Sequence, residues 1–134
     1  MSAFIDSFFQ TKGRLNRKGY ILRIVILIIL IFLCQVVMSQ LTNAQGNLRY
    51  AALFFLITQF ILLIGSLLIA VRRFHDLNLS GYWVIMIGVM NVVGVLSPGI
   101  QITTGLIQIG ITIFLMSIKG SKGENKYGAD PLES

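Results

Sequence analysis

Charged side chains are scarce in this chain of 134 residues: they make up 12% of it, while 55% of the residues are hydrophobic. A soluble domain carries about 25% charged residues, so this sequence cannot cover a globule with charge. No Asp, Glu, Lys or Arg occurs within residues 24–48, 50–71 or 77–118. Each run is long enough for a membrane-spanning helix, which needs about 20 apolar residues, and together they predict an integral membrane protein.

Cysteine and histidine occur only once each, as Cys34 and His75. One cysteine excludes a disulfide framework. One histidine is a poor basis for a zinc or haem site built by a single chain. We therefore expect neither a metal nor a cofactor.

The net charge of +6 comes from 11 lysines and arginines against 5 acidic residues. Such a balance also occurs in nucleic-acid-binding proteins, but here it is better explained by basic residues that flank membrane spans. We expect membrane lipids as partners, anionic headgroups among them, and no nucleic acid.

The apolar runs predict an all-α fold, a four-span transmembrane helical bundle that forms a single integral membrane domain over residues 1–134. The predicted segments are 1–19 at the cytoplasmic surface or interface, spans at 20–38, 50–71, 80–97 and 100–118, a cytoplasmic loop at 72–79 and a cytoplasmic tail at 119–134.

The first segment has its own pattern. Large apolar residues at Phe4, Ile5, Phe8 and Phe9 fall on one helical face, which predicts a short helix lying in the membrane interface; the alternative is a loosely packed terminus. The side chain of Asn16 can cap the helix of the first span.

The distribution of basic residues predicts the orientation. All lysines and arginines except Arg49 lie before or near the start of the first span, between the second and third spans, or after the fourth. These segments share one side of the membrane, and the positive-inside rule places that side in the cytoplasm. Both termini are therefore expected there.

The candidate site is a cytoplasmic cluster drawn from the first segment, the middle loop and the tail. Its members are Arg14, Arg17, Arg72, Arg73, His75, Asp76, Tyr127 and Asp130. Arginine matches phosphate and carboxylate groups, so the cluster could bind an anionic headgroup. The structural interpretation, anchoring plus ion pairs to Asp76, Asp130 or Glu124, is favoured because basic residues are the default at membrane ends.

Three motifs resemble a family of small bacterial inner-membrane proteins, the domain of unknown function 805 family. Residues 13–20 are similar to the family's G-R-x-x-R-x-x-Y, residues 72–83 to R-R-L-H-D-x-G-x-S-G-W-W and residues 123–131 to G-x-N-x-Y-G-x-x-P. The chain departs from the pattern at Asn78, where Gly is usual, and at Tyr82, where Trp is usual. The resemblance implies a fold and an inner-membrane location, and no activity.

A hydrolase triad is the sharpest catalytic interpretation, because Ser80 follows His75 and Asp76 closely. Adjacent residues do not usually form the line of hydrogen bonds that defines a triad. We expect His75 to bind a backbone carbonyl or Asp76 in a turn, and the chain not to be an enzyme.

The leading hypothesis is a non-enzymatic membrane module that binds anionic lipid or a protein partner through the cluster; a homo-oligomer is a further option. The alternative is a small-solute channel or transporter formed by oligomers. The spans offer it only neutral polar groups such as Asn91 and Gln108, which are more simply explained as interhelical hydrogen bonds.

Overall fold

The computed structural model describes residues 12–43, 48–96 and 98–133. This part of the chain is helical apart from turns and an isolated β-bridge between Asn125 and Gly128, as the sequence predicts. Its helices are α2 (Arg17–Asn43), α3 (Leu48–Asp76), α4 (Trp83–Leu96) and α5 (Pro98–Ser117). The interfacial helix expected within residues 1–11 lies outside the described residues.

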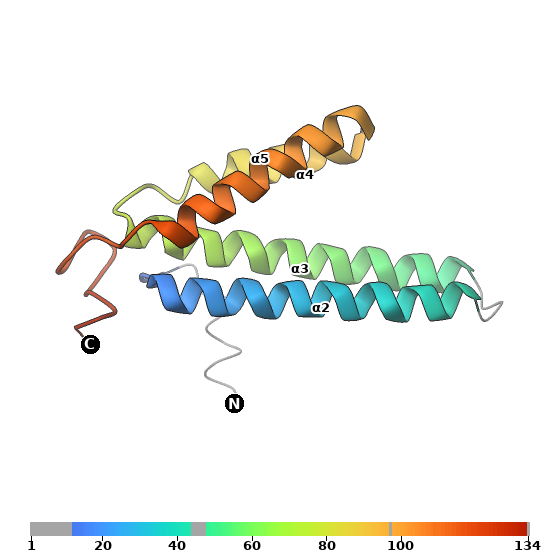
Figure 1. Ribbon diagram of the computed structural model, residues 1–134, viewed down its shortest axis with the longest axis horizontal. Helices are drawn as coiled ribbons and strands as arrows, with labels where there is room; N and C mark the ends of the chain where they lie inside the picture. The colour runs from blue at the N-terminus through green and yellow to red at the C-terminus, as the bar shows by residue number, and fades with distance from the viewer. Residues whose placement is uncertain (1–11, 44–47, 97, 134) are drawn as a thin grey trace.

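The helices form two hairpins, α2 with α3 and α4 with α5 (Figure 1). At one end the hairpins meet, and there the link from α3 to α4 and the tail after α5 also lie. From that end the hairpins diverge, so that α4 and α5 point away from α2 and α3 (Figure 1). At the opposite end, α2 and α4 end and α3 and α5 begin (Figure 1).

Three helices are long and apolar enough to cross a membrane, over Arg17–Thr42, Arg49–Asp76 and Gly99–Ser117. The expected span at residues 80–97 is shorter than predicted, because α4 begins at Trp83 and has 14 residues. At 1.5 Å per residue α4 extends about 21 Å, less than the hydrocarbon core of about 30 Å.

The helices that contain the first two predicted spans are longer than those spans. The helices extend past 20–38 and 50–71 at both ends, to 27 residues in α2 and 29 in α3. Residues 72–76, expected in a loop, form the last turn of α3. The helix continues through the charged residues Arg72, Arg73 and Asp76. It ends at the turn that follows Asp76, and not at the first charged residue, Arg72.

That turn is a Schellman motif. Asn78 adopts a left-handed conformation with φ 58°. The amide of Leu79 donates to the carbonyl of Phe74 (2.9 Å), and the amide of Asn78 donates to that of His75 (3.0 Å). These two bonds satisfy the free carbonyls at the end of α3. Asparagine tolerates this conformation better than most residues, so the departure from glycine at this position preserves the turn.

The beginning of α2 is capped as predicted. The side-chain oxygen of Asn16 accepts a hydrogen bond from the amide of Gly19 at 2.7 Å. This satisfies one of the amides that a helix leaves free at its start.

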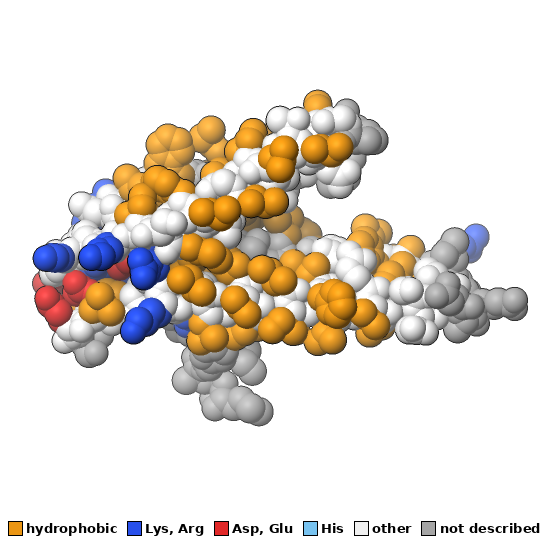
Figure 2. Space-filling model, viewed as in Figure 1, with side chains coloured by type: hydrophobic (Ala, Val, Ile, Leu, Met, Phe, Trp, Pro, Cys, Tyr) orange, Lys and Arg blue, Asp and Glu red, His pale blue; other side chains and the backbone are white. Residues whose placement is uncertain are grey.

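The buried apolar core is small and lies mainly where the hairpins meet. It consists of Leu15, Tyr20, Leu27, Ile69, Ala70, Phe74, Val84 and Leu115. Elsewhere large apolar side chains are exposed, among them Phe32 (65%) and Ile102 (71%). Figure 2 shows hydrophobic side chains over both hairpins, and most of the charged ones in view at their common end. This surface suits hydrocarbon and not water.

We predict that Asn78→Val lowers the free energy of unfolding by about 1–2 kcal/mol, because a branched L-residue is strained in a left-handed conformation. Asn78→Gly is the matched control and should change it by less than about 0.5 kcal/mol, since glycine adopts this conformation freely. Denaturant unfolding in detergent micelles measures both. Equal losses in the two variants would contradict the role of this turn.

Candidate functional site

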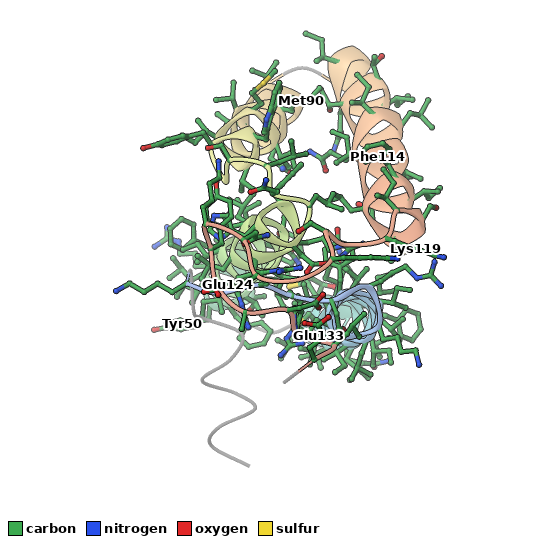
Figure 3. All side chains as sticks on the ribbon, turned by 90° about the vertical axis from the view of Figure 1, so that its left-hand side faces the viewer. Tyr50, Met90, Phe114, Lys119, Glu124 and Glu133 are labelled. Atoms are coloured by element: carbon green, nitrogen blue, oxygen red, sulfur yellow. The ribbon has the colours of Figure 1, made fainter. Side chains whose placement is uncertain are left out.

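Three segments distant in the sequence meet at the common end of the hairpins: residues 12–16, the last turn of α3, and residues 118–132. We call them the charged cap. The amide of Leu15 donates to the carbonyl of Arg72 (3.1 Å), and the amide of Ser121 donates to that of Asp76 (2.8 Å). Figure 3 looks onto this end, where the tail that carries Glu124 and Glu133 crosses in front of α2 and α3.

Asp76 is the centre of the charged cap. Its Oδ1 accepts from Arg14 Nε (3.2 Å) and lies 3.1 Å from Arg14 Nη2, while its Oδ2 accepts from Nη1 of Arg73. The side chains of Arg14, Arg73 and Asp76 are at most 3% exposed. One carboxylate thus pairs with two buried guanidinium groups, and such a network is stable only while its members are hydrogen-bonded.

Arg14 also fixes the tail. Its Nη1 donates to the carbonyl of Gly123 and its Nη2 to that of Ser121, both at 2.5 Å. Asp130 lies at the edge of this contact, with its Oδ1 4.0 Å from Arg14 Nη2. The Asp130 carboxylate accepts from the amides of Gly123 and Leu132, each at 3.0 Å, which closes the tail into a compact turn.

Arg73 joins the hairpins by capping the end of α5. Its Nε donates to the carbonyl of Leu115 at 2.9 Å, and its Nη2 donates to that of Ile118. A helix leaves its last carbonyls without partners and carries partial negative charge there. The Arg73 guanidinium, which reaches across from α3, donates hydrogen bonds to these carbonyls and places a positive charge beside them. Arg17 adds a 3.4 Å contact to the carbonyl of Ser117.

His75 holds the tail through its ring. The ring stacks on Tyr127, with centroids 3.8 Å apart and planes 8° from parallel. Its Nδ1 lies 3.3 Å from the carbonyl of Gly13, so Nδ1 carries the proton in this contact, because a carbonyl only accepts. Asn125 donates to the backbone carbonyl of His75 at 3.0 Å.

The predicted cluster residues therefore have different surroundings. Arg14, Arg73, Asp76 and Asp130 form one network, and His75 and Tyr127 pack beside it. Arg72 is half-buried, with Nη2 3.5 Å from the carbonyl of Arg14. Arg17 is exposed, and so is Glu124, which was considered as an ion-pair partner. The two most buried arginines already have protein partners.

The three residues of the possible triad, His75, Asp76 and Ser80, bind other groups and not one another. The carboxylate of Asp76 is held by arginines, His75 faces Gly13 and Tyr127, and the hydroxyl of Ser80 accepts from the amide of Tyr82 at 3.3 Å. Among residues 12–43, 48–96 and 98–133, no group of three or more His, Cys, Asp or Glu is placed to hold a metal ion.

Sequence reasoning missed a cavity beside the network. It has a volume of about 260 Å³, and four of the residues that line it are basic: Arg17, Lys18, Lys119 and Lys122. We call it the basic cavity. Asp76 and Asp130 also line it, but both are paired with arginine. Two lysines in the glycine- and serine-rich stretch 119–123 are the sequence signal that could have indicated this cavity.

The family model for proteins of unknown function DUF805 matches residues 8–129. The chain belongs to this family. Comparison with curated proteins and with solved structures gives no match. The matched region includes every helix of the described residues and most of the charged cap, so the family match extends over the site as well as the fold.

Gly120 shows how closely the tail approaches α3 in this DUF805 protein. A Cβ atom at this position would lie 2.7 Å from Cγ of Asp76. Real Cβ atoms do not come so close to a carboxylate. Only glycine lets the backbone of the tail pass beside the Arg14–Asp76–Arg73 network.

We predict that Asp76→Ala lowers the free energy of unfolding by about 3–5 kcal/mol, because it leaves two buried guanidinium groups without their carboxylate. Arg73→Ala should cost a similar amount. Denaturant unfolding in detergent gives the values. Glu124→Ala is the matched control, an exposed acid in the tail of the charged cap, and should cost less than about 0.5 kcal/mol. Unchanged stability in both cap variants would contradict the structural role of the network.

Proposed function

We propose that this chain is a non-enzymatic module of the bacterial inner membrane that binds a phosphate-bearing anionic lipid headgroup in the basic cavity. The observation that carries the proposal is that four basic residues line one cavity of about 260 Å³. Guanidinium and ammonium groups are the usual partners of phosphate.

The position of the cavity supports a lipid as the source of that phosphate. Arg17 and Lys18 are the first two residues of α2, and Lys119 follows the end of α5 by two residues. Basic residues at the ends of apolar helices lie at headgroup depth, where each contributes about 1 kcal/mol toward anionic lipid.

The buried network supports the site indirectly. Arg14 and Arg73 belong to the cluster that could bind a headgroup, but their hydrogen bonds are internal, in line with the structural interpretation of these arginines. We propose that Arg14 fixes the tail and Arg73 fixes the end of α5, and that these contacts position Lys119 and Lys122. A protein partner docked on the same surface is the competing explanation, and the lipid experiment below distinguishes the two.

The proposal includes an orientation with both termini in the cytoplasm. The first segment, the last turn of α3 and the tail meet in the charged cap. Both hairpins therefore enter the bilayer and return on the same side, and the positive-inside rule assigns that side to the cytoplasm. In this arrangement α4 and α5 supply the third and fourth of four membrane-embedded helices.

Reporter fusions test this orientation. Green fluorescent protein fused after Ser134 should fluoresce, because it folds in the cytoplasm, and alkaline phosphatase inserted after Thr42 should be active, because it requires export. The opposite pattern, an active phosphatase at the C-terminus and an inactive one after Thr42, would contradict the orientation.

We predict that Lys119→Ala/Lys122→Ala weakens retention of phosphatidylglycerol about 10- to 30-fold, because two surface lysines contribute about 2 kcal/mol. Native mass spectrometry of protein released from vesicles of phosphatidylglycerol and phosphatidylcholine measures the retained lipid. Lys12→Ala/Lys126→Ala is the control, since it removes the same charge from exposed positions outside the cavity.

Equal loss of phosphatidylglycerol in the two double variants would overturn the cavity as its site. A polypeptide that is released with the protein from its own membrane, and is lost in Lys119→Ala/Lys122→Ala alone, would move the function to a protein partner. The alternative of a small-solute channel formed by oligomers stays a prediction based on the neutral polar residues of the spans.

A further inference from the structure

A second cavity lies between the hairpins, apart from the charged cap. The space between α2–α3 and α4–α5 widens away from the cap (Figures 1 and 2). Toward the cap it holds a cavity of about 160 Å³ that is lined from all four helices. We call it the polar cavity, because Tyr20, Ser66, Asn91, Gln108 and Thr112 contribute to its walls.

Polar residues continue along one face of α5. Gln101, Thr104, Gln108 and Thr112 are spaced by three or four residues, which places them on the same side of a helix. Asn91 and Gln108 also line a neighbouring cavity of about 230 Å³ between α4 and α5. The two cavities therefore share a pair of carboxamide groups.

These carboxamides have unused hydrogen-bonding groups. Nδ2 of Asn91 donates to the carbonyl of Ile87 at 2.8 Å, which leaves its oxygen as an acceptor. The Gln108 side chain makes no hydrogen bond within the described part of the chain, and it is only partly exposed. In hydrocarbon an unpaired amide costs several kcal/mol, so these groups need a partner.

Gln59 gives a second indication on α3. Its Nε2 is buried and, among the described residues, has no hydrogen-bond partner. It precedes Ser66 of the polar cavity by seven residues, which is two helical turns, so both lie on the same face of α3. The face of α3 that carries Ser66 thus holds another unpaired amide.

The walls restrict what can bind. No charged side chain lines the polar cavity, so a phosphate would be buried there without a counter-charge, at high cost. Carboxamide and hydroxyl groups donate and accept hydrogen bonds, which suits a neutral head with hydroxyl and ester groups. The volume of about 160 Å³ is several times the share of one water in the liquid, about 30 Å³.

We propose that the polar cavity binds the uncharged head of a neutral lipid of the diacylglycerol class. Asn91 and Gln108 bind its hydroxyl and ester oxygens, and its acyl chains leave through the apolar space where the hairpins diverge. The site is separate from the basic cavity in position and in charge, so it goes beyond the anionic headgroup site and does not depend on it.

Photo-crosslinking tests the proposal. The full chain is placed in phosphatidylcholine nanodiscs that contain a photoactivatable diacylglycerol with its diazirine next to the ester group. After irradiation, mass spectrometry of peptides should locate the label on residues 87–94 and 101–112. Asn91→Leu/Gln108→Leu should lower this labelling at least fivefold. Gln35→Leu, an exposed carboxamide on α2 outside both cavities, should leave it unchanged.

A competition experiment on the unaltered protein tests the same site without a substitution, so it still applies if the double variant fails to fold. Excess dioleoylglycerol should remove the label, and the same amount of dioleoylphosphatidylglycerol should not. Labelling spread over the outer faces of the helices, or removed equally by both competitors, would overturn the proposal.

Discussion

The carboxylate of Asp76 binds two guanidinium groups, and the remaining structure depends on that arrangement. Arg73 belongs to α3 and reaches the last carbonyls of α5, whereas Arg14 belongs to the segment before α2 and reaches the tail. Neither arginine could remain buried without a counter-charge. One acidic side chain therefore connects both hairpins, the first segment and the tail.

The rest of the chain explains why this connection matters. In hydrocarbon, apolar surface gains nothing by leaving lipid for another helix, so association rests on packing and hydrogen bonds. The buried core is small, and most apolar side chains of the helices are exposed. The hairpins hold together at the charged cap and diverge beyond it (Figure 1). This divergence leaves room for the polar cavity, while the cap supports the basic cavity.

Composition and motif spacing predicted the helical fold, the family and the helix cap formed by Asn16. They did not predict that α3 continues to Asp76, because charge at a membrane surface does not end a helix; the Schellman turn does. The cluster of basic and acidic residues was also predictable, but the sequence did not predict which of its members form internal ion pairs and which line a cavity. Burial decides which arginine pairs internally and which lysine faces a cavity, and burial depends on how distant segments meet.

The central claim is that Asp76 and Arg14 stabilise the fold through each other, across 62 positions of the sequence. A double-mutant cycle with Arg14→Met, Asp76→Asn and the combined variant, followed by denaturant unfolding in detergent, measures this coupling. We predict a coupling free energy above about 1 kcal/mol, with the double variant losing less stability than the sum of the single variants. Additive losses, within about 0.3–0.5 kcal/mol, would contradict the claim that this buried pair holds the two hairpins and the tail together.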